Sequence, residues 1–435
     1  MAQYAILPDQ PVADMDAYVA AGGGRGLERA VELGPDATVE RIKAAGLRGR
    51  GGAGFPTGLK WGSVREAASE PGSTPYVACN AAEGEPGTYK DRRLMANNPF
   101  ALVEGVLIAA SVLEAPESFI AVKYHYTHEI GRLVTAQEQA IKADWPGADR
   151  LQIVPGPDDY LFGEEKALLE VIEGKLAMPR LLPPFQVGLF ATMAAPNPTV
   201  ANNVETFCHA AAIMADGPEA FRSVGTEDSP GTMIFTIVGD VERPGTYEMP
   251  LGITLRELLV DIAGAQDPKA ILSGTSNPVG TAGHLDVPCC FKALSDAGFG
   301  LGSGGFIVYG QQRDMVQIAE RMAAFLAAES CGQCTACKLG NADMAERLGL
   351  LVRGEGTPED VEEIKKRTEH VSDAARCFLP TGSAFTIRSI IDVFPEEFAE
   401  RAQGVPSPPE VAVPVPKINS LDETTGEVVY AQKEY

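Results

Sequence analysis

Three closely spaced cysteines constrain this chain more than any other feature of its sequence. Cys331, Cys334 and Cys337 follow one another at spacings of three. Thiolates at this spacing can bind three irons of a cubane cluster, while a remote cysteine binds the last iron. Cys377 is the predicted fourth ligand, because it lies between two predicted helices and can fold back over the cluster. The pattern predicts a [4Fe–4S] cluster.

Two alternatives to this assignment stay open. Zinc is the first, although zinc sites more often use two separated pairs of ligands than a triplet and a single residue. The second concerns the fourth ligand, for which Cys289 and Cys290 compete with Cys377 from the preceding predicted domain. Eight cysteines in 435 residues do not make a disulfide scaffold. A metal therefore remains the best explanation of the cluster of cysteines.

The acidic balance of the chain excludes one class of partner. There are 36 Lys and Arg residues against 59 Asp and Glu, a formal net charge of −23. Such a charge repels a phosphate backbone, so we expect no nucleic acid. The most apolar run, 100–115, contains Glu104 and is shorter than the roughly 20 residues that cross a bilayer. We expect no direct membrane insertion and no secretion signal, hence a cytoplasmic protein, either free or on the cytoplasmic side of a membrane complex.

The first half of the chain alternates strand-like and helix-like segments. Short apolar runs at 76–78, 119–122 and 151–154 are separated by longer helical patterns such as 99–113 and 128–143. Alternation of this kind is typical of an α/β layer architecture.

The second half changes character twice. A predicted hairpin at 233–249 and a short helix at 254–262 indicate a small β-grasp-like domain. Four helical patterns follow, at 315–328, 340–352, 358–375 and 384–401. Four such helices in sequence predict a bundle.

A glycine-rich segment, 49–54, is the best candidate for a ligand-binding loop. It formally matches G-x-G-x-x-G, but a helix-like segment precedes it where the dinucleotide fingerprint needs a strand. Its glycines allow backbone amides to approach a ligand closely, and Arg48, Arg50 and Lys60 add positive charge. A flexible surface loop is the alternative interpretation.

Three polar clusters elsewhere suit the same ligand. The run 80–87 follows a predicted strand, where ligands of open α/β sheets bind. Asn202 and Asn203 stand at a predicted helix start, whose free amides favour a phosphate. Glu164 and Glu165 open another predicted helix. Taken singly, these asparagines are ordinary helix caps and these acids complement a helix dipole.

Together these motifs resemble a known family. The matching segments are 46–61, 83–92, 160–165, 202–206 and 329–337. They are similar, in order, to the flavin-bearing NADH-dehydrogenase (diaphorase) subunit of respiratory complex I and of related soluble hydrogenases and formate dehydrogenases. The resemblance covers about residues 38 to 400, and the chain is a divergent member.

The resemblance implies FMN and NAD(H) sites with named residues. For FMN they are Gly49, Arg50, Gly51, Gly52, Lys60, Asn80, Glu83, Tyr160, Gly163, Asn202 and Asn203. For the nicotinamide nucleotide they are Phe55, Glu85, Glu164, Glu165 and Phe185. Glu83 and Glu85 are the implied catalytic residues. Hydride would pass between the nicotinamide and FMN, and single electrons would pass on to the [4Fe–4S] cluster.

The resemblance also implies a fold and partners. The expected parts are an N-terminal arm (1–37), a Rossmann-like α/β FMN domain (38–220), a β-grasp, soluble-ligand-binding domain (221–312), a four-helix bundle with the cluster (313–403) and an extended C-terminal tail (404–435). The chain has no second cysteine quartet. A companion [2Fe–2S] subunit and further redox subunits of a larger complex are therefore expected.

Departures from the family pattern concentrate in the nucleotide motifs. Ala82 stands where the family usually has an aspartate, and Leu182 where it has a lysine. The loss of that cation should weaken the binding of a polyanionic dinucleotide. One alternative is therefore a flavin and iron–sulfur subunit that exchanges electrons with a donor such as ferredoxin or another partner protein. A second alternative is a scaffold without turnover.

Overall fold

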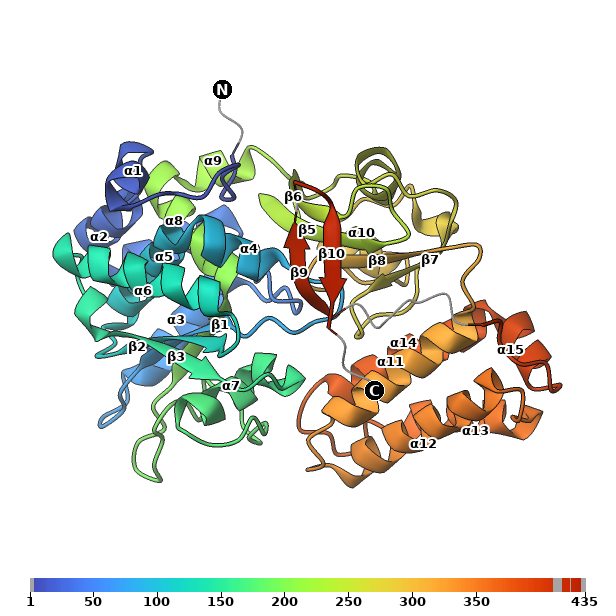
Figure 1. Cartoon of the computed structure of the whole chain (residues 1–435). Helices are drawn as coiled ribbons and strands as arrows, with labels where there is room; N and C mark the ends of the chain where they lie inside the picture. The colour runs from blue at the N-terminus through green and yellow to red at the C-terminus, as the bar shows by residue number, and fades with distance from the viewer. Residues whose placement is uncertain (1–3, 410–416, 423, 432–435) are drawn as a thin grey trace. The chain divides into compact units, whose positions relative to one another are not determined.

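A computed structural model describes residues 4–409, 417–422 and 424–431 (Figure 1). The chain forms two compact units, which we describe separately. Unit 1 comprises the described residues up to Gly84, together with Tyr89–Ile234 and Glu248–Gly252. Unit 2 comprises Glu85–Thr88, Phe235–Tyr247 and the described residues from Ile253 onward.

Unit 1 contains a parallel four-stranded sheet. Its strands are β1 (Tyr76–Ala81), β2 (Ser118–Lys123), β3 (Leu151–Gly156) and β4 (Thr199–Asn203), in the order β3-β2-β1-β4. All three pairings are parallel. Parallel strands need long crossover connections, and helices that cover both faces of the sheet supply them.

The central strand β1 shows how the two faces are covered. Val77 and Cys79 belong to one apolar cluster, with residues of α5 (Pro99–Leu113) and α8 (Val204–Asp216). Ala78 belongs to a second cluster, with residues of α7 (Glu165–Ile172). Successive side chains of a strand point to opposite faces, so the small and branched residues of β1 pack on helices in both directions.

The other helices of unit 1 are short or flank this core. They are α1 (Met15–Ala20), α2 (Arg25–Ala45), α3 (Thr57–Ala68), α4 (Lys90–Asn97), α6 (Thr127–Lys142), α9 (Pro218–Arg222), η1 (Ala148–Arg150) and η2 (Tyr160–Gly163). Helix α5 shows the local signals that set a boundary. The Asn98 side chain accepts a hydrogen bond from the Ala101 amide, Pro99 occupies the first turn, and Glu114 ends the helix at φ 53.

The predicted N-terminal arm needs a correction, because most of it is helical. Helices α1 and α2 lie within it, and Leu27 and Ala30 are buried in the main core of unit 1. The helix-like segment expected before the glycine-rich segment is the end of α2, which begins at Arg25 and has a kink at Gly34, where φ is 77. The Gly34-Pro35 pair conceals this continuity, because both residues normally break helices.

Unit 2 contains a second, mixed sheet. Strands β5 (Thr232–Gly239), β6 (Gly245–Pro250), β7 (Pro268–Ser273) and β8 (Gly305–Gly310) have the order β6-β5-β8-β7, with β5 and β8 parallel and β7 and β8 antiparallel. The ends of β5 and β6 belong to unit 1. The helix expected at 254–262 is a π-helix, η3 (Arg256–Ile262). Two short elements complete this region, η4 (Ala282–His284) and α10 (Phe291–Asp296).

Four helices of unit 2 pack side by side, orange to red in Figure 1. They are α11 (Met315–Glu329), α12 (Thr335–Val352), α13 (Pro358–His370) and α14 (Leu379–Val393). A capping box between Thr357 and Asp360 begins α13. The helix predicted at 384–401 is broken, because Pro395 begins a separate helix, α15 (Pro395–Arg401). A proline disfavours helical geometry in the residue before it, here Phe394.

The predicted extended tail contains a hairpin. Strands β9 (Ile418–Asp422) and β10 (Glu427–Tyr430) pair antiparallel. Pro414 and Pro416, two of the prolines that favour an extended tail, lie outside the described residues. Composition alone does not predict these strands, because Asn419, Ser420 and Asp422 are polar residues that are common in turns.

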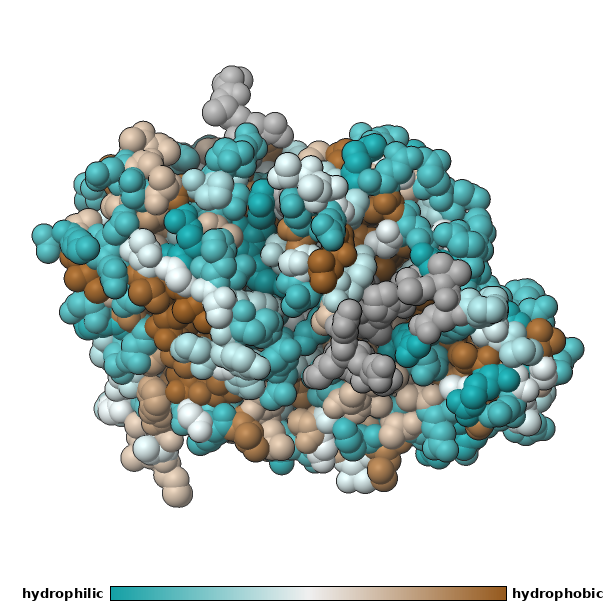
Figure 2. All heavy atoms as spheres, in the orientation of Figure 1, coloured by the Kyte–Doolittle hydropathy of each residue, from teal (hydrophilic) through white to brown (hydrophobic). Residues whose placement is uncertain are grey.

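Apolar segments are buried in the cores. Among the described residues, no single helix is long and apolar enough to cross a membrane; only α4 and α5 pass such a test together, as a pair bent by 99°. Both helices are largely buried in unit 1. Figure 2 shows hydrophilic side chains over most of the visible surface, with separate apolar patches.

Candidate functional site

The carboxyl ends of β1 and β4 bring three predicted residues together in unit 1. Asn80 and Asn203 are register partners on these neighbouring strands, and Asn202 precedes Asn203 in β4. Asn203 also caps α8 by accepting a hydrogen bond from the Glu205 amide. Ligands of open α/β sheets bind at this edge, where helix N-termini expose amides.

The glycine-rich loop lies against the same edge. The Gly49 amide donates to the Phe55 carbonyl at 2.8 Å, which closes the loop. The Arg50 amide donates to the Thr206 hydroxyl, in the first turn of α8, at 2.9 Å. A Cβ added to Gly51 would lie 3.1 Å from the Cβ of Asn203. The loop therefore needs small residues here to approach the start of α8 closely.

The side chain of Arg50 has a structural role. Arg50 is 1% exposed, and its guanidinium donates to the carbonyls of Arg48, Pro230 and Thr232. Burial lowers its pKa to about 10, against the raising effect of Glu205 and other neighbours. The expectation that Arg50 offers positive charge to a ligand is thus wrong for its side chain, while its backbone belongs to the loop.

Lys60 and Asn80, two further predicted FMN residues, make hydrogen bonds to other residues of the predicted sites. The Lys60 ammonium contacts a Glu165 carboxylate oxygen at 3.1 Å and the Ala201 carbonyl at 2.9 Å. The Asn80 amide donates to the Gly163 carbonyl at 2.6 Å, at the end of η2. Tyr160 begins η2. An ammonium has three N–H groups, so Lys60 has one more to offer to an anion.

Behind this polar edge lies a buried charge network that sequence reasoning missed. Lys90 is fully buried and contacts Asp91 at 2.7 Å and Glu205 at 2.9 Å. It also donates to the Asn203 side chain, whose amide donates to Asp91 at 2.6 Å. Lys90 and Asp91 do lie within a segment that matches the family, 83–92. However, the sequence of this segment does not show which of its charged residues are buried.

Glu83 is held by a second buried ion pair. Its carboxylate accepts from the Asp91 amide at 2.9 Å and from the Arg92 guanidinium at 2.9 Å. Both side chains of the Glu83–Arg92 pair are nearly inaccessible. The Tyr126 hydroxyl donates to the Glu83 carbonyl at 2.5 Å. These contacts fix Glu83 in place before any ligand binds.

The network sets charge states at the start of α8. Burial by itself would raise the pKa of Glu205, but Lys90, His209 and Arg50 outweigh it and lower the value to about 2. Burial lowers the pKa of His209 to about 4, so this histidine is neutral at pH 7. Glu205 thus carries a negative charge that Lys90 neutralises inside the protein.

The predicted nucleotide residues are divided between the two units. Glu164 caps α7 by accepting from the amides of Lys166 and Ala167, and burial raises its pKa to about 7. Phe55 and Phe185 are about half exposed. Glu85 belongs to unit 2, where its carboxylate accepts from the Thr275 amide at 2.6 Å.

The four predicted cluster ligands lie in unit 2, at the starts of α12 and α14. Cys334 is the N-cap of α12 and Cys337 lies in its first turn, where a helix N-terminus favours thiolates. Among the described residues, no group of three or more His, Cys, Asp or Glu side chains is arranged to hold a metal ion. The residues still suit a cluster, because the Ser330 hydroxyl and the Asn341 amide lie within 3.5 Å of the Cys337 sulfur and can donate to it once it is a thiolate.

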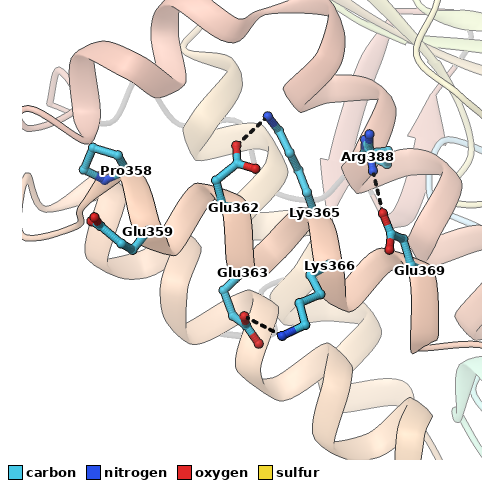
Figure 3. A pocket seen from close by; sticks show the side chains of 8 residues that line it. All are labelled: Pro358, Glu359, Glu362, Glu363, Lys365, Lys366, Glu369 and Arg388. Carbon is cyan, nitrogen blue, oxygen red and sulfur yellow. Dashed lines mark hydrogen bonds and ion pairs between the residues drawn. The ribbon is translucent and has the colours of Figure 1, made fainter.

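A surface hollow on α13 and α14 is a different feature. It has a volume of about 550 Å³ and is lined mainly by charged residues (Figure 3). Lys365, Lys366 and Arg388 are each paired with a glutamate there. Exposed pairs of this kind contribute little to stability, and none of the predicted site residues lines the hollow.

Comparison with family models gives the class of protein. Residues 42–212 match the Nuo51 FMN-binding domain, residues 234–273 the SLBB domain, and residues 317–401 the NADH-ubiquinone oxidoreductase-F iron–sulfur binding region. The fold and these matches define a flavin and iron–sulfur oxidoreductase subunit, with FMN and a [4Fe–4S] cluster as its cofactors.

Relatives place the chain in one family. It is 39% identical over 400 residues to an F subunit of the NADH-quinone oxidoreductase of Rhizobium meliloti, covering 88% of this chain and 93% of the relative. It is 37% identical to the corresponding F subunit of Escherichia coli, with 88% of each chain covered. The chain belongs to the family of NADH-quinone oxidoreductase F subunits.

A solved structure supports the same assignment. The chain superposes on a chain of an NAD⁺-reducing [NiFe]-hydrogenase in its H₂-reduced state with a TM-score of 0.80 and 33% sequence identity. The match covers 93% of this chain and 68% of the hydrogenase chain. The predicted resemblance is therefore confirmed by both sequence and fold.

Proposed function

We propose that this chain is the electron-entry subunit of a multisubunit oxidoreductase, in which hydride passes between NAD(H) and FMN and single electrons pass on to a [4Fe–4S] cluster. When bound, FMN supplies the exchange of two electrons with a nicotinamide and of one electron at a time with a cluster. The observation that carries the proposal is the convergence of the glycine-rich loop, Lys60 and the Asn80, Asn202 and Asn203 side chains on one sheet edge.

The residues of this edge fit a flavin phosphate and ring. Gly51 and Gly52 allow a ligand to approach the backbone closely, Gly49 closes the loop, and Lys60 supplies a cation whose counter-charge, Glu165, lies beside it. Asn202 and Asn203 lie at the same edge, where the Asn202 oxygen accepts from the Trp61 indole and Lys90 and Asp91 hold the Asn203 amide. We assign these residues, with Arg50 through its backbone, to FMN.

A rigid support for this edge follows from the buried ion pairs. Lys90 and Asp91 hold the Asn203 side chain in one orientation, and Arg92 holds Glu83. Preorganised groups of this kind position a ligand without having to order themselves first. The role of Glu83 is then to bind and orient from a fixed position beside β1.

The nucleotide would be bound by Phe55 and Phe185, which offer exposed rings, together with Glu164 and Glu165 at the start of α7. Tyr160 and Gly163 precede these acids at the end of η2. Glu85 completes the proposed nucleotide and catalytic set. The Thr275 amide and hydroxyl both donate to its Oε1 atom, which fixes the orientation of this carboxylate.

The four cysteines Cys331, Cys334, Cys337 and Cys377 would hold the cluster. We propose the finer architecture with it: a Rossmann-like α/β FMN domain within 38–220, a β-grasp domain within 221–312 and a four-helix bundle within 313–403. The parallel order β3-β2-β1-β4 and the mutual packing of α11 to α14 support these proposals.

Partners and location follow from the family. The relatives are subunits of NADH-quinone oxidoreductases, and the structural neighbour is part of a hydrogenase. We therefore propose partner subunits for this chain, one of them carrying a [2Fe–2S] centre, and a cytoplasmic location, either free or at the cytoplasmic face of a membrane complex.

An anaerobic titration tests this function. The full chain, loaded with FMN and iron, should lose its flavin absorbance on addition of NADH. A second candidate, with a protein donor such as ferredoxin, is favoured by one observation: Leu182 is 44% exposed at the position of the family's lysine. Bleaching by a reduced ferredoxin but not by NADH would establish that candidate. Absence of flavin and iron from the purified chain would contradict both.

A further inference from the structure

A buried amide connects the cysteine segment of α12 to helix α14. Asn341 and Ser383 are both fully buried. The Asn341 Nδ2 atom lies 2.9 Å from the Cys337 carbonyl and 3.5 Å from the Cys337 sulfur. Its Oδ1 atom lies 2.5 Å from the Ser383 hydroxyl. One side chain therefore joins a predicted cluster ligand to the helix that follows Cys377.

The orientation of this amide is determined by its partners. A backbone carbonyl can only accept, so the Asn341 NH₂ group must face Cys337. The Ser383 hydroxyl then faces the amide oxygen and donates to it. With both ends fixed, the N–H that points toward the Cys337 sulfur has no freedom to rotate away.

The environment of Cys337 differs from that of the other predicted ligands. Cys337 is buried, whereas Cys331, Cys334 and Cys377 are partly exposed. The Cys337 sulfur has a second close donor, the Ser330 hydroxyl at 3.3 Å. Hydrogen bonds to cluster sulfurs and exclusion of solvent both affect a reduction potential. Donated N–H and O–H groups favour the reduced cluster, because it carries the more negative charge.

We infer that Asn341, held by Ser383, is a positioning residue that raises the reduction potential of the cluster bound at Cys337. The inference rests on the proposed function only in requiring the cluster itself. The Asn341–Ser383 pair thereby increases the fraction of cluster that is reduced at a given potential, before electrons pass to a partner. It also holds the start of α12 against α14, and so the segment that carries three cysteines against the helix that follows the fourth.

The test is a potential measured on the full chain with its FMN and cluster in place. Asn341→Leu keeps the size of the side chain and removes its N–H groups. An EPR-monitored redox titration should show the ratio of oxidised to reduced cluster raised about tenfold at a given potential, a midpoint about 59 mV more negative. Iron content should stay at the wild-type level. A fully loaded Asn341→Leu protein with the wild-type midpoint would overturn the inference.

Three further variants keep the test decisive if Asn341→Leu loses its cluster. Ser383→Ala leaves the amide in place but frees its orientation, so the midpoint should shift in the same direction by a smaller amount, and Ser383→Thr should restore it. Ser389→Ala is the matched control, since this hydroxyl on α14 bonds to the Val279 amide, away from α12. Equal midpoints for Ser383→Ala and Ser389→Ala would contradict the proposed role.

Pulsed EPR adds a readout that a merely structural role would leave unchanged. In D₂O, the reduced cluster of the wild-type protein should show a coupled exchangeable deuteron that Asn341→Leu lacks. Identical spectra would count against the hydrogen bond. Absence of iron from the wild-type protein would instead overturn the proposed function, and this inference with it.

Discussion

The polar sheet edge of unit 1 and the cysteine segment of unit 2 prepare for their cofactors in different ways. At the sheet edge, Lys90, Asp91 and Glu205 are already paired and fully enclosed. Of the four predicted cluster ligands in unit 2, three thiols are partly exposed, and among the described residues no group is arranged as a metal site. A flavin binds through many weak contacts and needs a finished surface. A cluster forms strong bonds and can complete the geometry of its own site.

The largest effect should come from removing a cluster ligand. Cys334→Ser should abolish bound iron and acid-labile sulfide, because a serine cannot replace the thiolate at the start of α12. FMN content should stay near the wild-type level, since unit 1 has its own core. Iron and flavin analysis of the purified chain measures both.

The competing fourth ligands provide the control for this experiment. Cys377→Ser should lose the cluster as Cys334→Ser does, whereas Cys290→Ser should keep it. Unchanged iron in Cys334→Ser would contradict the ligand assignment. Loss of iron in Cys290→Ser alone would move the fourth ligand to the preceding region.

The next effect concerns the buried charges of the sheet edge. Lys90→Met leaves Asp91 and Glu205 enclosed without their cation, which should lower the free energy of unfolding by about 3 to 5 kcal/mol. Chemical denaturation of the full chain, followed by flavin fluorescence, measures the loss. Lys60→Met is the matched control: its ion pair is partly exposed, so it should cost about 1 kcal/mol or less while weakening FMN binding. Equal losses of unfolding free energy in Lys90→Met and Lys60→Met would contradict the difference between the buried and the partly exposed ion pair.

A smaller effect is a pH dependence that arises from Glu164. Burial raises the pKa of this carboxyl from 4.5 to about 7. The folded protein therefore keeps a proton on Glu164 that the unfolded chain releases, so the contribution of this carboxyl to stability should be complete below pH 4.5, fall as the pH rises to 7, and be absent above that. The fall amounts to at most about 3 kcal/mol.

Glu164→Gln should remove this contribution to the slope of unfolding free energy against pH, because the amide does not titrate. Glu165→Gln, at the more exposed neighbouring position, is the control and should keep it. Unfolding curves across pH 4.5 to 7 in which Glu164→Gln keeps the wild-type slope would show that this carboxyl is not protonated in the folded state.

The smallest effect tests the altered nucleotide motif. Leu182→Lys restores the cation of the family pattern at a half-exposed position, so the KM for NADH should fall about two- to fivefold, the size expected of an exposed charge pair. Leu176→Lys adds the same charge at another exposed leucine and should leave KM unchanged. No difference between the two variants would count against the family's binding pose.

Much of the fold follows from local sequence signals. The helix predicted at 99–113 is α5, and the strands predicted at 76–78, 119–122 and 151–154 lie within β1, β2 and β3. Such elements are predictable from hydrophobic periodicity and from the Gly and Pro residues that end helices and strands. The errors occur at such residues. Gly34-Pro35 suggests a helix end inside α2, whereas the apolar pattern at 384–401 predicts one helix that Pro395 divides into two.

The candidate site was predictable by residue type but not by role. Glycines and asparagines mark the sheet edge because few other residues allow that backbone approach and those contacts. By contrast, whether a charge is buried depends on the tertiary neighbours. The sequence suggests that Arg50 offers a cation to a ligand, whereas its guanidinium donates to backbone carbonyls. Asn341 belongs to no motif, so the sequence does not predict its contact with Cys337.

The most direct test of the account is a rapid-mixing experiment with NADH on the loaded, anaerobic chain. Freeze-quenched samples should show flavin bleaching first and the EPR signal of a reduced [4Fe–4S] cluster afterwards, while Cys334→Ser should bleach without developing that signal. A flavin that bleaches while an intact cluster stays oxidised, with a midpoint that would permit its reduction, would contradict electron transfer between the two cofactors of this chain.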